Sequence, residues 1–138
     1  MSWDGTAMSR DSDAGARPAR EPHAVSGIAL TFDLAAEAEA LTREPPWQAH
    51  GHNAKTLVKH PDFRVVLIAL KAGARMQEHK TDQCVTIHVL QGRLRIHLAP
   101  NGLELPMGAL LALEQTTVHD VEALVDSVFL LSLGWTAR

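Results

Sequence analysis

The 138-residue chain contains 46% hydrophobic and 21% charged residues, with a formal net charge of −3. This length suits one globular domain with a core of its own, and the composition excludes a wholly disordered or fibrous chain. The slightly acidic balance provides no basic surface for a phosphate backbone, so we expect no nucleic-acid partner.

The chain has a single cysteine, Cys84, and therefore cannot form an internal disulfide. Nothing in it requires an oxidising compartment. No segment approaches the ~18 consecutive apolar residues of a membrane helix, and the first residues lack the apolar core of a signal peptide. These features predict a cytoplasmic protein without a membrane partner.

The first segment, residues 1–26, consists mostly of Ser, Asp, Gly, Ala, Arg and Pro without periodicity. That composition is typical of a flexible leader, and whether the leader is native stays open. Residues 27–138 are expected to form one domain.

A short amphipathic helix is predicted over about residues 32–44. Three apolar residues share one helical stripe: Leu34, Ala38 and Leu41. Asp33 is placed to cap the first turn, and we expect Pro45 and Pro46 to end the helix.

From about residue 54 to 135, short runs rich in Val, Ile and Leu alternate with Gly, Pro, Asn and Asp, as in a sandwich or barrel. Gln91-Gly92 suits a tight hairpin turn, since glycine reaches positive φ without steric cost. Antiparallel strands with short connections favour a double-sheet jelly roll. The predicted strands are Lys55–Lys59, Arg64–Lys71, Met76–His79, Cys84–Leu90, Leu94–Leu98, Leu103–Leu105, Ala109–Leu113, His119–Ala123 and Val128–Leu133.

The segment from Gly73 to Gly92 reads GARMQEHKTDQCVTIHVLQG. It resembles the metal motif G-x5-H-x-H-x3-E-x6-G of the cupin superfamily, whose two histidines and glutamate hold a divalent metal. His79 matches the first histidine, but Thr81 stands at the second histidine and Val85 at the glutamate. A threonine hydroxyl is a poor neutral donor and valine donates nothing.

The second half of that signature reads G-x5-P-x-G-x2-H-x3-N, and residues 113–123, LEQTTVHDVEA, keep its histidine as His119. Over about residues 55–135 the chain is similar to small single-domain bacterial cupins that carry H-x-T. The resemblance implies a mostly β, double-stranded β-helix (a jelly-roll, RmlC-like cupin barrel) with one short N-terminal helix.

Residue by residue, the resemblance leaves His79 and His119 as the imidazoles at ligand positions. Two ligands are too few for an ordinary zinc or iron site, so a third donor would have to come from Gln83 or another histidine. His88 lies three residues past Val85 and on a regular strand points to the opposite face. A divalent metal (Zn, Fe, Mn or Ni) stays open, and so does a pair of histidines that is only hydrogen-bonded.

Other side chains are weaker candidates. Arg64 or Arg75 could hold a carboxylate or phosphate at the barrel mouth, although the general exposure of arginine favours a solvated strand residue. Thr81 could donate to the same ligand or only satisfy the strand end. The pair His50 and His52 would share one face if extended, but such surface histidines are common without a role.

Two further residues have ordinary interpretations. His97 should alternate outward with Arg93 and Arg95 if the residues between them face inward. Cys84 is expected to pack as a small apolar group, because no neighbour in the sequence clearly lowers its pKa.

The segments Val65–Leu70 and Val128–Leu133 are apolar almost throughout, which predicts burial on both sides. A second subunit packed sheet to sheet would supply the outer cover, so we expect a homodimer. The predicted helix could cover part of the same surface and would weaken this inference.

For function, the sequence favours binding of a small polar or anionic molecule at the barrel mouth. The candidate ligand-binding residues are His79, His119, Thr81, Gln83 and Arg64. One alternative is a metal-dependent enzyme of the dioxygenase or isomerase type, in which His79 and His119 ligate the metal. The other is a structural or regulatory interaction module.

Overall fold

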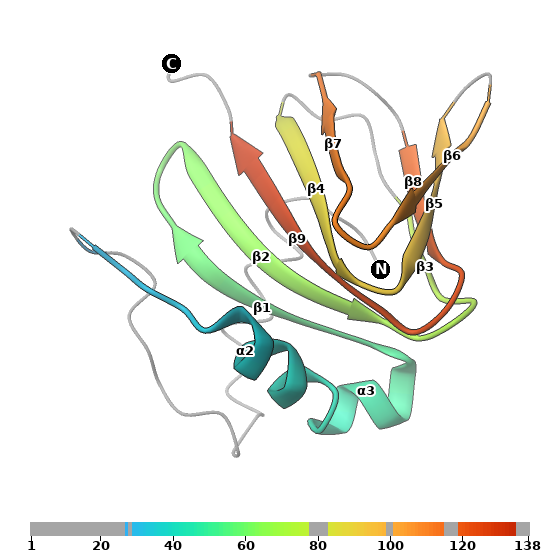
Figure 1. Ribbon diagram of the computed structural model, residues 1–138. Coiled ribbons are helices and arrows are strands. Elements are labelled where there is room, and N and C mark those ends of the chain that lie inside the picture. Colours follow the sequence, from blue (N-terminus) through green and yellow to red (C-terminus); the bar gives the residue numbers. More distant parts are fainter. Residues whose placement is uncertain (1–26, 28, 78–82, 99–100, 115–118, 135–138) are drawn as a thin grey trace.

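The computed structural model describes residues 27, 29–77, 83–98, 101–114 and 119–134 (Figure 1). The described strands form a five-stranded sheet, in the order β1-β2-β9-β4-β7, and a four-stranded sheet, in the order β3-β8-β5-β6. They are β1 His52–Lys59, β2 Phe63–Leu70, β3 Arg75–Met76, β4 Cys84–Gln91, β5 Arg93–Leu98, β6 Leu103–Pro106, β7 Leu110–Leu113, β8 His119–Ala123 and β9 Ser127–Gly134.

This architecture confirms the mostly β jelly roll expected from the sequence, with every strand pair antiparallel. Each predicted strand is present with bounds shifted by a few residues. The third is described only as Arg75–Met76, and its predicted end at His79 lies outside the described residues. The predicted leader, residues 1–26, also lies outside them.

The main core lies between the two sheets and follows the period-two pattern of the strands. On β4 the buried side chains are Val85, Ile87 and Val89, which alternate with half-buried or exposed neighbours. The same alternation on β8 and β5 brings Val121 and Ile96 into one cluster with them.

Two helices precede the strands in the described part of the chain, so the expectation of one helix ended by prolines is wrong. α2 spans Leu34–Leu41, with Asp33 Oδ1 accepting a hydrogen bond from Ala36 N at 3.1 Å. Pro45 and Pro46 begin a second helix, α3, Pro45–His50. Proline is well accepted there because the first helical turn has no partner for its N–H groups. Neither described helix has the length and apolarity to cross a membrane.

α2 and α3 cover the outer face of the five-stranded sheet on its β1 and β2 side (Figure 1). Leu41 and Trp47 of the helices pack against Leu67, Ala69 and Val128 of the strands, which are all nearly or fully buried. The outer side of β2 is therefore largely covered within one chain, whereas Leu130 and Ser132 on the outer side of β9 are only half-buried. The homodimer stays a prediction, and the helices weaken its ground over β2.

Candidate functional site

One end of the sandwich gathers the predicted ligand-binding positions from both sheets. In the five-stranded sheet, the register places Arg64 of β2 beside Leu133 of β9, and Leu133 beside Val85 of β4. In the four-stranded sheet, His119 at the start of β8 pairs with Leu98 at the end of β5. Because β4 and β5 meet in a hairpin at the opposite end, these five residues lie at the same end. We call it the mouth, and it is the upper end in Figure 1.

His119 faces the interior of the mouth, as the sequence predicts. It is only 3% exposed and lies two residues before Val121, which belongs to the core between the sheets. His79 and Thr81, its expected companions, lie outside the described residues. Gln83 is half-buried directly before β4, at the same end of the sandwich.

Arg64 is buried at the mouth, so the expectation of a solvated strand arginine is wrong. It is 8% exposed and shares its face of β2 with the core residues Val66 and Ile68. Burial lowers the pKa of its guanidinium from the ordinary value. The period-two alternation of Arg64 with Val66, Ile68 and Leu70 could have predicted an inward side chain. The general exposure of arginine in proteins predicted an outward one.

Lys59 is a mouth residue that sequence reasoning missed. The ladder between β1 and β2 shifts by one residue between Thr56 and Val58. The extra residue, Leu57, packs on the outer face among the residues beneath the helices. Beyond this bulge Lys59 pairs with Arg64, and paired residues lie on the same face. Without the bulge, Lys59 would lie on the helix-covered face, and nothing in the sequence signals the extra residue.

The arrangement of sheets is that of several solved structures. It matches a cupin superfamily protein from Desulfitobacterium hafniense DCB-2 with a TM-score of 0.61 and 14% identity, over 63% of this chain and 80% of that one. It matches an RmlC-like cupin from Shewanella frigidimarina NCIMB 400 with a TM-score of 0.58 and 14% identity, over 64% and 79%. The chain has the cupin fold.

A conserved protein of unknown function from Streptococcus pyogenes is similar over more of the molecule. It has 16% identity and a TM-score of 0.64, over 87% of this chain and 99% of that one. No family model and no curated protein sequence matches the chain. Likeness at these identities shows the cupin fold alone, and the fold leaves the ligand open.

The described part of the mouth does not fit an ordinary metal site of the kind the cupin motif builds. Val85, at the glutamate position of the motif, is 5% exposed and belongs to the apolar core. His88 lies on the opposite face of β4, as expected, where it pairs with the exposed Leu110. Among the described residues no group of three His, Cys, Asp or Glu side chains could hold a metal ion. His119 is an imidazole that these residues place in the mouth, without the three-donor group that the motif would need.

The remaining candidates do not face into the mouth. The rings of His50 and His52 stack with centroids 5.9 Å apart, on either side of a left-handed Gly51, so this pair is not the extended H-x-H considered above. Cys84 is exposed, and the expectation that it packs among apolar groups is wrong. It alternates with Val85, so its face of β4 is the outer one.

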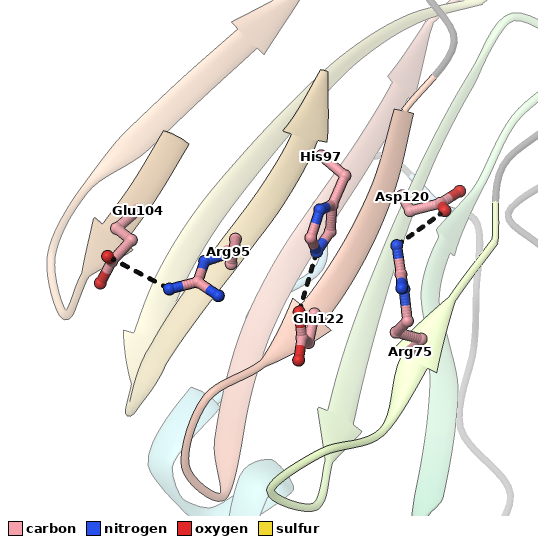
Figure 2. Close-up of polar contacts among 6 residues, drawn as sticks. All are labelled: Arg75, Arg95, His97, Glu104, Asp120 and Glu122. Carbon is pink, nitrogen blue, oxygen red and sulfur yellow. Dashed lines mark hydrogen bonds and ion pairs between the residues drawn. The ribbon is translucent and has the colours of Figure 1, made fainter. Parts of the chain in front are cut away.

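The outer face of the four-stranded sheet carries ion pairs across its strands (Figure 2). His97 Nε2 lies 2.8 Å from Glu122 Oε1, and Arg75 Nη2 lies 3.2 Å from Asp120 Oδ2. His97 therefore points outward, as predicted, and Arg75 does not reach into the mouth. These pairs are part-exposed and stabilise the fold only modestly.

Glu122 should make part of the stability depend on acid pH. The hydrogen bond with His97 is the main cause that holds its pKa below the usual 4.5, with help from Arg75 and Arg95. A carboxyl with a depressed folded-state pKa stabilises above its unfolded pKa, and that contribution is lost as the pH falls through the folded value. We expect Glu122→Gln to lower the urea midpoint at pH 6 and to match the parent chain near pH 3. If the urea midpoints of Glu122→Gln and the parent chain differ by the same amount at both pH values, the depressed pKa of Glu122 does not contribute to stability.

Proposed function

We propose that this protein binds a small anionic molecule at the mouth. Arg64 and His119 are its ligand-binding residues in the described part of the chain, with His79, Thr81 and Gln83 as further candidates. The observation that carries the proposal is their placement, 8% and 3% exposed, on the inner faces of opposite sheets at one end. The guanidinium of Arg64 can donate two parallel hydrogen bonds to a carboxylate or phosphate. The imidazole of His119 can donate a hydrogen bond to the same group from the opposite sheet.

The burial of Arg64 supports this role on energetic grounds. Taking a guanidinium out of water carries a desolvation cost, and an apolar side chain would fill the same inner position of β2 without it. Its inner-face neighbours along β2, Val66 and Ile68, are apolar and fully buried. Residues that a fold would be more stable without are typical of binding sites.

A metal-dependent reaction has less support from the same residues. Divalent metals bound by imidazoles usually need three or four protein donors. The described mouth offers His119, while Val85 is apolar and Arg64 brings a positive charge that repels a cation. We therefore assign no catalytic step to these side chains.

The test is ligand binding by the full chain and by matched arginine variants. A thermal-shift screen of acetate, butyrate, succinate, inorganic phosphate and glucose should show that at least one anion raises the melting temperature, since any ligand selective for the native state must do so. Calorimetric titration of that anion should show affinity reduced by about 30-fold or more in Arg64→Met, because the removed charge is buried. Arg64→Lys should retain part of the binding.

Arg95→Met is the control, because Arg95 lies on the outer face, near Glu104. It should leave anion binding unchanged. The proposal fails if no anion shifts the melting temperature, or if the shift survives Arg64→Met. Elemental analysis of the same preparations distinguishes the metal interpretation, which requires near-stoichiometric metal that is lost in His119→Ala.

A further inference from the structure

Along one side of the sandwich, inward-facing leucines remain accessible to solvent. β6 and β7 are the last strands of the two sheets, and a short turn after Pro106 joins them, so they lie on the same side of the molecule (Figure 1). Leu103 of β6 pairs with Ile96, and Leu111 of β7 pairs with Ile87; both partners are fully buried core residues. Because paired residues share a face, both leucines point inward. Leu103 is nonetheless 42% exposed, and Leu111 is half-buried.

Two more leucines extend this apolar surface to the mouth. Leu113, at the end of β7, pairs with Val85, and Leu98, at the end of β5, pairs with His119. Both leucines therefore belong to the inner face at the mouth, and both are half-buried. Their side chains offer apolar contact without a hydrogen-bond donor or acceptor. We call four residues the leucine side: Leu98, Leu103, Leu111 and Leu113.

The row of paired residues across the five-stranded sheet relates the leucine side to Arg64. Leu133, Val85 and Leu113 follow Arg64 on successive strands. Leu113 thus lies three strand spacings of about 4.8 Å, or roughly 14 Å, from Arg64 across the sheet. A long arginine side chain and an alkyl chain of several carbons can together span that separation. Half-buried Gln83, just before β4, is a polar neighbour of the row. The row therefore has a guanidinium toward one end and a leucine at the other.

From this arrangement we infer that the ligand is an amphiphilic monocarboxylate, whose carboxylate lies at Arg64 and whose apolar chain lies along the leucine side. The inference rests on the proposed function and deepens it, because it specifies the part of the ligand away from the charge. Accessible leucine side chains gain free energy when apolar surface covers them. The hydroxyl groups of a sugar acid would instead lose water there without gaining hydrogen-bond partners.

Hexanoate and gluconate are the matched probes, since both have six carbons and one carboxylate and differ in the hydroxyl groups of gluconate. In calorimetric titrations of the parent chain, we expect hexanoate to bind about tenfold or more tightly than gluconate. From acetate through butyrate to hexanoate, each added methylene should raise the affinity by up to about fourfold, the value for a fully buried methylene. Arg64→Met should weaken acetate and hexanoate alike, as the proposed function requires.

Variants of the leucine side test where the chain lies. Leu113→Gln should reduce the hexanoate affinity by about fivefold to tenfold and leave the acetate affinity within about twofold of the parent value. Leu103→Gln, at the more exposed position, should reduce the hexanoate affinity by about threefold, and it carries the test if Leu113→Gln shows no cooperative thermal transition. Leu110→Gln is the matched control, because Leu110 is also on β7 but lies on the outer face and is 66% exposed. It should change neither affinity.

Three results would overturn the inference while leaving the anion site intact. The first is a gluconate affinity equal to or greater than that of hexanoate. The second is a hexanoate affinity that is the same in the parent chain, Leu103→Gln and every folded preparation of Leu113→Gln. The third is hexanol binding as tightly as hexanoate, because the chain would then bind without a carboxylate at Arg64. If no anion binds, the proposed function itself fails.

A second copy of this chain is the alternative cover for the leucine side. Analytical ultracentrifugation of the parent chain, Leu103→Gln and Leu110→Gln distinguishes it from a ligand. A dimer that dissociates in Leu103→Gln but not in Leu110→Gln, together with equal affinities for acetate and hexanoate, would assign the leucines to a subunit contact and reject the inference. Hexanoate binding that depends on Leu103 at concentrations where the chain is monomeric supports it.

Discussion

Replacing Gly92 by alanine should lower the free energy of unfolding by about 2–5 kcal/mol, from backbone strain of about 1–2 and overpacking of about 1–3 kcal/mol. Gly92 has a φ of +84°, where a Cβ is unfavourable. That Cβ would also lie 2.3 Å from Ser127 Oγ and 2.5 Å from the Asp126 carbonyl oxygen, far inside contact distance. The clash cannot be relieved cheaply, because Ser127 Oγ accepts a hydrogen bond from Arg93 N at 3.0 Å and holds the hairpin against β9.

Gly73 and Gly108 provide matched controls for the backbone part of this effect. Their φ angles are +85° and +88°, but an added Cβ would meet nothing within 4 Å at either position. Their alanine variants should therefore lose only about 1–2 kcal/mol. Urea denaturation of the three variants separates strain from overlap. If all three lose the same stability, the close approach of Gly92 to Ser127 has no energetic consequence.

The variant Asn53→Asp should be destabilised by about 3 kcal/mol or more at neutral pH, because one oxygen of the buried carboxylate would face two acceptors, although the other would keep the Ala54 N–H as its donor. Asn53 is 1% exposed and belongs to β1, with its side chain against the end of α2. Its Nδ2 donates to the Leu41 carbonyl oxygen at 3.0 Å and to Glu44 Oε1 at 2.8 Å. Aspartate has the same shape, but its carboxylate would face the carboxylate of Glu44 and the carbonyl of Leu41.

Acid pH should restore part of that loss. Burial beside another carboxylate raises the pKa of the new carboxyl pair in the folded state above its unfolded value near 4. The penalty is therefore present above the raised pKa and is relieved as the pH falls through it, since a protonated carboxyl can donate to the other. Urea midpoints of the parent chain and Asn53→Asp should differ most near pH 7.5 and converge toward pH 4.

Asn101→Asp is the matched control, because Asn101 is exposed. It should leave the urea midpoint nearly unchanged at both pH values. A gap between Asn53→Asp and the parent chain that is small, or equal at both pH values, would show that the Asn53 amide does not need to donate to Glu44.

The strands were predictable because burial on a sheet is a local pattern. β4 and β8 read inward and outward alternately in the sequence, and the structure has them with nearly the expected bounds. The Gln91-Gly92 turn was predictable for a similar reason, since a positive φ needs glycine. The helical segment was harder to predict. Pro45 can end one helix or begin the next, and only the packing of Trp47 on the sheet distinguishes the two.

The candidate site was predictable only in part. His119 was placed by the spacing of a resemblance, and the structure puts it inside the mouth as expected. The alternation of residues along β2 could have predicted that Arg64 faces inward, but arginine is usually exposed, and that favoured a solvated side chain. The position of Lys59 in the mouth could not be predicted from the sequence. Its face depends on the bulge at Leu57, and no residue pattern in the sequence marks that bulge.

The amino-acid pattern by itself determined that this chain forms an antiparallel jelly roll, because period-two burial and glycine turns are properties of short segments. Only the tertiary structure decided that helices of the same chain cover β2, and that Lys59, Arg64 and His119 share one end. Those facts depend on strand register and on sheet-to-helix packing, and a shift of one residue in register moves a side chain to the opposite face.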